Sequence, residues 1–355
     1  MTLELFAITA VKTLVLFLTI VHVAPIMLYV ERKGAALIQD RPGPNRVGPF
    51  GLLQPIADFV KLLMKENEPP AHVNRGLWYL APFLTLVPAC LTTAALPFAD
   101  YAIIGGHKVL LQIANIDVGI LYVLAIGSLG IYGIMFGGWA SNNKFSLIGA
   151  MRSASQIISY EIPLGLAAVG AVTIFGTFSL REMTLAQEGL IFGILPNWGI
   201  FYQPLGFLVF FVSAFAETNR LPFDLPETEA ELVAGFHTEY GSMNFATFFM
   251  AEYMNMATLS GLMTAMYFGG WHLPWVTDAT LFSWLGNSRN LLALVQFLVF
   301  CSKIAVFMII FVWVRWTLPR FRLDHLMRLT WRNLIPLGLV NILATAVFLY
   351  WRASQ

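Results

Sequence analysis

Residues 289–314 read RNLLALVQFLVFCSKIAVFMIIFVWV, and Arg289 and Lys303 are the only charged side chains in this run. A helix that rises 1.5 Å per residue needs about 20 apolar residues to cross a bilayer core roughly 30 Å thick. Seven further runs of spanning length occur, at 4–30, 78–98, 116–138, 157–178, 199–216, 245–268 and 334–351. The sequence therefore predicts an all-α membrane protein, a bundle of about eight transmembrane helices forming one polytopic domain, 1–355.

The composition agrees with a chain whose solvent is lipid. Hydrophobic residues make up 58% and charged residues 12%, against about 45–50% and about 25% in soluble domains. A formal net charge of +1 gives no field that would recruit nucleic acid. Cys90 and Cys301 both lie in apolar runs, and the six histidines show no metal-ligand spacing. We expect no nucleic-acid partner, and no flavin, iron–sulfur cluster or metal in this chain.

Basic residues are unequally divided between alternate loops. Fifteen of the 21 lie in the odd-numbered loops, while the remainder are Lys108, Arg181, Arg289 and Arg352 on the other side and Lys12 and Lys303 within the runs. Because Lys and Arg accumulate in cytoplasmic loops, this bias places both termini on the outer side. Tryptophans near the ends of the runs, such as Trp78 and Trp271, predict interfacial aromatic belts.

An amphipathic segment, GLLQPIADFVKLLMK, occupies residues 51–65 of the first cytoplasmic loop. Its apolar residues recur at helical spacing, at Leu52, Ile56, Phe59, Val60 and Leu63, and polar residues such as Asp58 fall on the opposite face. The segment is too short to span and is expected to lie along the membrane interface. It is either a plain surface anchor or one wall of a portal through which a lipid-soluble substrate enters sideways.

The loop at 217–244 is acidic and predicted to be cytoplasmic. Its carboxylates are concentrated at Glu217, Asp224, Glu227, Glu229 and Glu231. One interpretation is structural, because Pro226 suits the first position of a helix and acidic residues in a first turn favour the helix dipole. The other is functional, because Glu227 and Glu231 lie four residues apart and would repel each other on a helix.

Ionisable side chains also enter the membrane runs themselves. At 1.5 Å per residue, Glu161, Glu252 and Lys303 are expected roughly 7, 12 and 18 Å from the cytoplasmic end. Charges at such depth are costly and usually line a cavity or a proton path. The acidic loop would therefore lead into a series of ionisable groups descending toward the bilayer centre.

The motifs of this sequence resemble those of a known family, which contains the H subunit of bacterial NADH-quinone oxidoreductase and the mitochondrially encoded subunit 1 of complex I. The resemblance covers nearly the whole chain. Its motifs are ERK at 31–33, GPNRVGPFGLLQP at 43–55, GWASN at 138–142, SYE at 159–161, AETNR at 216–220, PFD at 222–224, FMAEY at 249–253 and PRFRLD at 319–324.

The resemblance implies a multi-pass subunit of proton-pumping respiratory complex I in the bacterial inner membrane, not catalytic alone, that forms much of the quinone tunnel. The substrate would be a quinone, ubiquinone or menaquinone. The partners would be soluble quinone-site and iron–sulfur subunits above it, small membrane subunits alongside, and lipid.

The family's roles carry over to individual residues of this chain. Those bordering the tunnel or its mouth would be Arg32, Arg41, Asp58, Phe223 and Asp224, joined by Phe59 on the amphipathic portal segment. Those linking quinone reduction to proton translocation would be Glu161, Glu217, Glu227, Glu229, Glu231, Glu252 and Lys303.

Two other classes of function compete with this one. The related subunit of membrane-bound hydrogenases keeps the helical scaffold but admits no quinone, and the complete Gly43-Pro-Asn-Arg46 segment favours the complex I family. An independent secondary transporter would need internal repeats, and none is found. A purely structural scaffold is hard to reconcile with charges buried at three depths.

Overall fold

The computed structural model describes residues 3–191, 193–226 and 228–354. Within these residues six helices are long and apolar enough to cross a membrane: Glu4–Ile38, Arg75–Ala95, Gly119–Ala140, Lys144–Phe175, Arg289–Thr317 and Leu323–Trp351. The strands of the described chain form two sheets of two strands each. The prediction of an all-α membrane protein is confirmed.

Helices occupy all eight of the predicted apolar runs. They are α1 (Leu3–Val21), α2 (Val23–Ile38), α4 (Arg75–Thr92), α5 (Gly119–Ser128), α6 (Gly130–Ala140), α7 (Lys144–Phe175), α10 (Pro204–Glu217), α12 (Ser242–Tyr267), α14 (Arg289–Thr317) and α16 (Ile335–Ala353). Helix α10 has 14 residues, fewer than the ~20 of a typical crossing, and α12 is less apolar than the six helices above. The number of crossings stays a prediction.

Short elements fill the connections between these helices. They are α3 (Gln54–Met64), α8 (Leu180–Leu185), α9 (Gly199–Tyr202), α11 (Glu229–Leu232), α13 (Asp278–Trp284), α15 (Leu323–Arg328), the 3₁₀ turns η1 (Pro49–Gly51), η2 (Thr93–Ala95) and η3 (Gly235–His237), and the π-helical turn η4 (Leu329–Leu334). Strand β1 (Pro97–Ile104) pairs antiparallel with β2 (His107–Gln112), and β3 (Leu190–Ile191) pairs with β4 (Leu195–Pro196).

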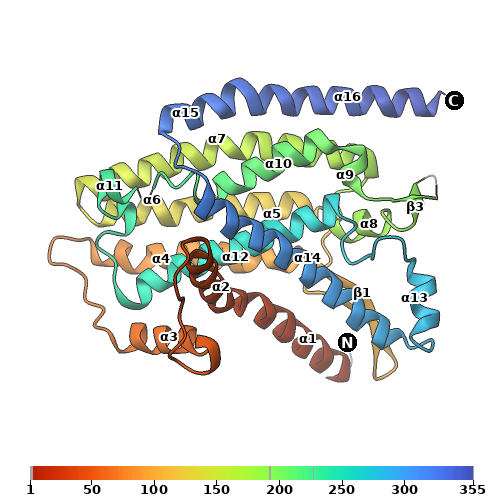
Figure 1. Cartoon of the computed structure of the whole chain (residues 1–355), viewed down its shortest axis with the longest axis horizontal. Coiled ribbons are helices and arrows are strands. Elements are labelled where there is room, and N and C mark those ends of the chain that lie inside the picture. The colour runs from red at the N-terminus through yellow and green to blue at the C-terminus, as the bar shows by residue number, and fades with distance from the viewer. Residues whose placement is uncertain (1–2, 192, 227, 355) are drawn as a thin grey trace.

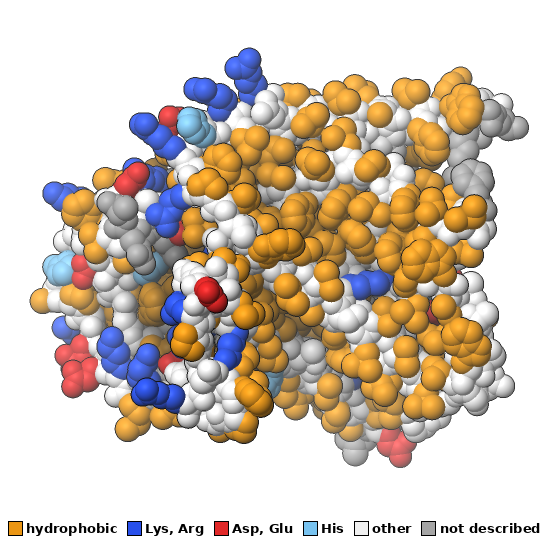
Figure 2. All heavy atoms as spheres, in the orientation of Figure 1, with side chains coloured by type: hydrophobic (Ala, Val, Ile, Leu, Met, Phe, Trp, Pro, Cys, Tyr) orange, Lys and Arg blue, Asp and Glu red, His pale blue; other side chains and the backbone are white. Residues whose placement is uncertain are grey.

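The two ends of the bundle differ in character. Figure 1 shows α3, α11 and α15 at one end, which we call the basic end, and β1, α8 and α13 at the other, which we call the hairpin end. Both chain termini lie toward the hairpin end, as an even number of crossings requires (Figure 1). On the face seen in Figure 2, most Lys and Arg side chains gather at the basic end, and hydrophobic side chains cover much of the rest.

Glycines bring α6 close to its neighbours. A Cβ atom at Gly133 would overlap Cγ2 of Thr85 on α4, and one at Gly138 would overlap Cβ of Ala150 on α7. Small residues at such crossings let two helix backbones approach closely in a membrane. This packing holds α4 and α7 on either side of α6.

Aromatic side chains fill much of the interior. Trp78 stacks on Tyr240 with ring centroids 5.1 Å apart, and both Trp78 and Trp271 are only 1% exposed. The belt prediction is therefore wrong for these two tryptophans, because they pack inside the bundle and not at its lipid surface.

A partly buried ion-pair cluster ties the hairpin end together. Asp100 in β1 accepts hydrogen bonds from Arg181 of α8 and Arg289 of α14, each at 2.5 Å. These three side chains are between 14% and 20% exposed. Three segments far apart in the sequence are thus fixed around one carboxylate.

Candidate functional site

A buried carboxylate lies at the centre of the basic end. Glu31 of α2 is 8% exposed and accepts hydrogen bonds from Arg220 at 3.1 Å, from the hydroxyl of Tyr253 at 2.6 Å and from Arg315. The four side chains come from α2, α12, α14 and the segment after α10. None of these four residues is predicted to be a site residue from the sequence, although Glu31, Arg220 and Tyr253 lie in the family motifs.

Arg220 connects this carboxylate to a second one. Its Nη2 lies 3.6 Å from Oε2 of Glu252, and its guanidinium lies over the Tyr253 ring at 4.4 Å. Burial by itself would lower the pKa of Arg220, but the acidic groups of Tyr253, Glu31 and Glu252 raise the pKa above its ordinary value. Arg220 therefore keeps its positive charge between two carboxylates.

A cavity opens beside this cluster, and two of the expected tunnel residues, Arg32 and Arg41, line it. Its wall includes Glu31, Arg32, Arg41, Phe249, Tyr253 and Trp316. Asp58 on α3 accepts a hydrogen bond from Arg32 at 2.5 Å and so fixes α3 against α2. Apolar side chains together with the guanidinium groups of Arg32, Arg41 and Arg315 suit a ligand that has an apolar body and a polar head.

The exposed face of α3 is apolar. Its exposed hydrophobic side chains, together with those of the neighbouring loop, are Phe50, Leu52, Leu53, Ile56, Phe59, Val60, Leu63 and Met64, and Lys61 is exposed beside them. The side chain of Asp58, by contrast, is only 11% exposed and faces the bundle. The helix that the spacing predicts within 51–65 is present as Gln54–Met64.

The membrane carboxylates meet around two adjoining cavities. Glu217 and Glu252 line a narrow cavity of about 40 Å³, and Glu161 and Glu217 line a larger one of about 310 Å³. Glu217 and Asn255 belong to both linings. The structure therefore brings together Glu161 and Glu252, which were predicted within the membrane runs, and Glu217 from the start of the acidic loop.

Two further acidic-loop residues, Asp224 and Glu231, do not line these cavities. Asp224 accepts a hydrogen bond from Arg320 at 3.0 Å, and neighbouring Phe223 packs between Tyr160 and Phe321. Glu231 pairs with Arg152 at 2.6 Å and has a 56% exposed side chain. Glu227 and the side chain of Glu229 lie outside the described residues.

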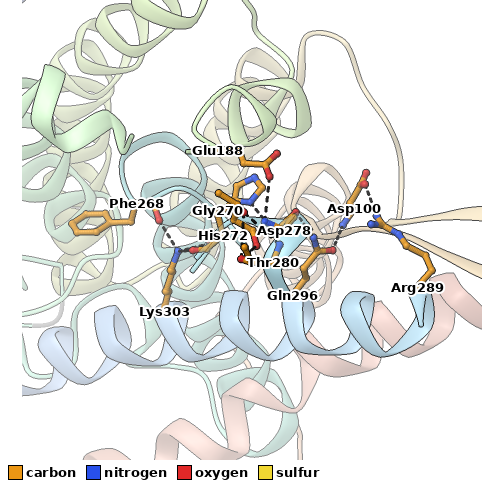
Figure 3. Close-up of polar contacts among 11 residues, drawn as sticks. Asp100, Glu188, Phe268, Gly270, His272, Asp278, Thr280, Arg289, Gln296 and Lys303 are labelled. Atoms are coloured by element: carbon orange, nitrogen blue, oxygen red, sulfur yellow. Dashed lines mark hydrogen bonds and ion pairs between the residues drawn. The ribbon is translucent and has the colours of Figure 1, made fainter. Parts of the chain in front are cut away.

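Lys303 lies at the hairpin end of α12, away from the glutamates. Its Nζ donates to the carbonyl oxygens of Phe268, Gly270 and His272, at 2.6–2.8 Å (Figure 3). Three carbonyl acceptors at the end of a helix satisfy an ammonium group completely. These contacts favour a role in fixing the end of α12.

The fold and the site define a multi-pass membrane protein that buries a charged cluster between cavities. A family model described as NADH dehydrogenase matches residues 11–346. The chain is 47% identical to the H subunit of NADH-quinone oxidoreductase from Bdellovibrio bacteriovorus over 98% of both chains. It is 48% identical to the corresponding H subunit, numbered 1, of Cytophaga hutchinsonii over 95% of both, and 46% identical to that of Geobacter metallireducens over 98% of both. The chain therefore belongs to the family of the NADH-quinone oxidoreductase H subunit, which confirms the resemblance.

Proposed function

We propose that this chain is the membrane subunit of a proton-pumping NADH:quinone oxidoreductase that admits the quinone and couples its reduction to proton translocation. The observation that carries the proposal is the continuity of ionisable groups. Glu31 borders the cavity beside Arg32 and Arg41, and Arg220 bridges Glu31 to Glu252. Glu252 shares the smaller cavity with Glu217, and Glu217 shares the larger one with Glu161.

The quinone head would enter the cavity that Arg32 and Arg41 border. Guanidinium groups donate hydrogen bonds to the oxygens of such a head, and they stabilise the negative charge that reduction brings. The apolar tail would pass along α3, where Phe59 is 53% exposed. The Asp58–Arg32 pair would hold this portal helix in place, while Phe223 and Asp224 would border the tunnel through their contacts near Arg320 and Phe321.

The coupling step would begin at the Glu31–Arg220 cluster. A new negative charge near Glu31 would compete for Arg220, and any shift of Arg220 changes the field at Glu252. The cavity between Glu252 and Glu217 has room for a few water molecules, which could carry a proton between the two carboxylates. Glu161 would receive the proton next, and Glu227, Glu229 and Glu231 would supply negative charge at the entrance.

The partners and the location follow from the family. The relatives are named as subunits of NADH-quinone oxidoreductase, so this chain would assemble with soluble quinone-site and iron–sulfur subunits at its basic end. Small membrane subunits and lipid would cover its apolar sides. The location would be the bacterial inner membrane, with both termini on the outer side.

The test of the coupling proposal is Glu217→Gln in the assembled, reconstituted complex. Glutamine keeps the size and hydrogen bonding of the side chain but cannot ionise, so quinone reduction and proton uptake should fall together. Oxidation of NADH by an artificial acceptor in the soluble arm should stay at the wild-type rate. The matched control is Glu182→Gln, because Glu182 is an exposed carboxylate in α8 at the hairpin end.

Wild-type quinone reduction and an unchanged number of protons per electron in Glu217→Gln would contradict the proposal. Loss of all activity, including the reaction with the artificial acceptor, would instead show that the variant complex had failed to assemble. Glu161→Gln and Glu252→Gln should then be measured in the same way, since each borders one of the two cavities.

A further inference from the structure

Three side chains with metal-binding groups meet at the hairpin end. Glu188 follows α8, His272 follows α12, and Asp278 is the first residue of α13. One ligand atom from each lies within 4.8 Å of the other two. Figure 3 shows Glu188, the His272 ring and Asp278 grouped together, separate from the Asp100–Arg289 pair.

One distance within this group matches the spacing of two ligand atoms on a metal ion. Nδ1 of His272 lies 3.3 Å from Oδ1 of Asp278, which is long for an N–H···O bond with a usual length of about 2.9 Å. Two ligand atoms bound at 2.0–2.1 Å to a tetrahedral zinc ion lie roughly 3.3 Å apart. The Nδ1–Oδ1 distance therefore equals one edge of a zinc coordination shell.

His272 is also the kind of side chain that such a site requires. The residue is 3% exposed, and its Nε2 has no hydrogen-bond partner within the described part of the chain. No short bond commits either ring nitrogen, so Nδ1 can present its lone pair to a cation while Nε2 carries the proton.

Neighbouring groups hold the three ligands in position. Gln296 donates to Oδ2 of Asp278 at 2.7 Å, leaving Oδ1 toward His272. Lys303 donates to the carbonyl oxygen of His272 at 2.6 Å. Glu188 accepts the backbone N–H of Asp278 at 3.2 Å. Such supporting hydrogen bonds orient ligands in protein metal sites.

We propose that Glu188, His272 and Asp278 form a binding site for a divalent zinc ion, with water in the fourth position. One imidazole and two carboxylates are borderline-to-hard ligands that suit zinc. The ion would connect the segments after α8 and α12 to the start of α13. Lys303 would not take part in the site, because its Nζ contacts the carbonyl oxygen of His272 and not the imidazole.

The experiment measures zinc bound by the whole purified complex after chelator treatment and dialysis against buffered free zinc. The wild-type complex should bind about one zinc ion more than the Glu188→Gln complex. If both bind the ion, the wild-type affinity should be at least about tenfold higher. This variant is chosen because Glu188 is exposed, so the change should not disturb folding. Its amide oxygen still accepts the Asp278 N–H but is a poor zinc ligand.

His272→Gln should lose the same ion, and Glu182→Gln should keep it, because Glu182 is an exposed carboxylate on the neighbouring α8 with no place in the group. Zinc binding should also weaken as the pH falls, since zinc and protons compete for the imidazole. Equal zinc content in wild type, Glu188→Gln and His272→Gln would overturn the proposal. If His272→Gln does not assemble, Glu188→Gln decides the question alone.

Discussion

The buried cluster around Glu31 predicts that two substitutions of the same chemical kind will lower the stability of the protein by very different amounts. Glu31→Gln removes the charge that Arg220 and Arg315 share, while Asp58→Asn removes the charge that Arg32 contacts. The Glu31 and Arg220 side chains are 10% and 5% exposed, whereas Arg32 is 43% exposed. Burial decides the difference, because water can solvate Arg32 after its partner is lost.

The expected loss of stability in each variant follows from these exposed fractions. Breaking a buried pair by removing one partner costs about 3–5 kcal/mol, because the other charge stays buried. Glu252 remains 3.6 Å from Arg220, and Arg315 is 23% exposed, so we expect the low end, about 3 kcal/mol. Asp58→Asn should cost about 1 kcal/mol, the upper range for exposed pairs.

The assay is the temperature at which the purified complex loses quinone reductase activity irreversibly. Glu31→Gln should lower this midpoint clearly more than Asp58→Asn does. Adding Arg315→Gln to Glu31→Gln should recover part of the loss, because it removes one of the uncompensated charges. Equal midpoints for Glu31→Gln and Asp58→Asn, or a double variant as weak as the sum of its parts, would refute the reasoning.

Four further predictions concern the portal, the helix ends and the packing. Phe59→Asp should slow reduction of long-tailed quinones more than of short-tailed analogues, and Phe59→Leu should not; equal loss with both substrates would leave α3 as a surface anchor. Lys303→Met should lower the inactivation temperature, because bonds from a charged donor contribute about 1.5–3 kcal/mol each; normal stability with fewer protons per electron would assign Lys303 to coupling instead. Gly133→Ala should reduce the yield of assembled complex by overpacking, at about 1–3 kcal/mol, whereas Gly130→Ala, with nothing within 4 Å, should not; similar yields would contradict the close α4–α6 contact. A reporter enzyme at the C-terminus should be active only outside and one near Lys61 only inside; a cytoplasmic C-terminus would rule out the eight-crossing topology.

The membrane helices could be predicted because their lengths are set by the bilayer and not by tertiary contacts. The β1–β2 hairpin was missed, although its signal is present. Gly105 and Gly106, both at positive φ, separate two β-rich runs, a pattern typical of a two-residue turn. Strands of 8 and 6 residues are too short to be recognised as apolar runs of spanning length.

Depth along a helix was enough to group Glu161 with Glu252, but it could not give the partners of Glu31. Arg220 and Arg315 lie 189 and 284 residues from it in sequence, and only the packing of α2 against α14 and the segment after α10 brings them together. Depth was also insufficient for Lys303, because the direction of its side chain depends on the chain beyond α12.

The Asp100 cluster constrains how this protein can diverge. Replacing Asp100 alone would leave Arg181 and Arg289 close together without their shared counter-charge, and replacing one arginine would leave the other to neutralise the carboxylate. Loss of one arginine therefore leaves a neutral pair, whereas loss of the aspartate leaves two like charges side by side. The first substitution among positions 100, 181 and 289 should consequently fall on an arginine in descendants of this sequence.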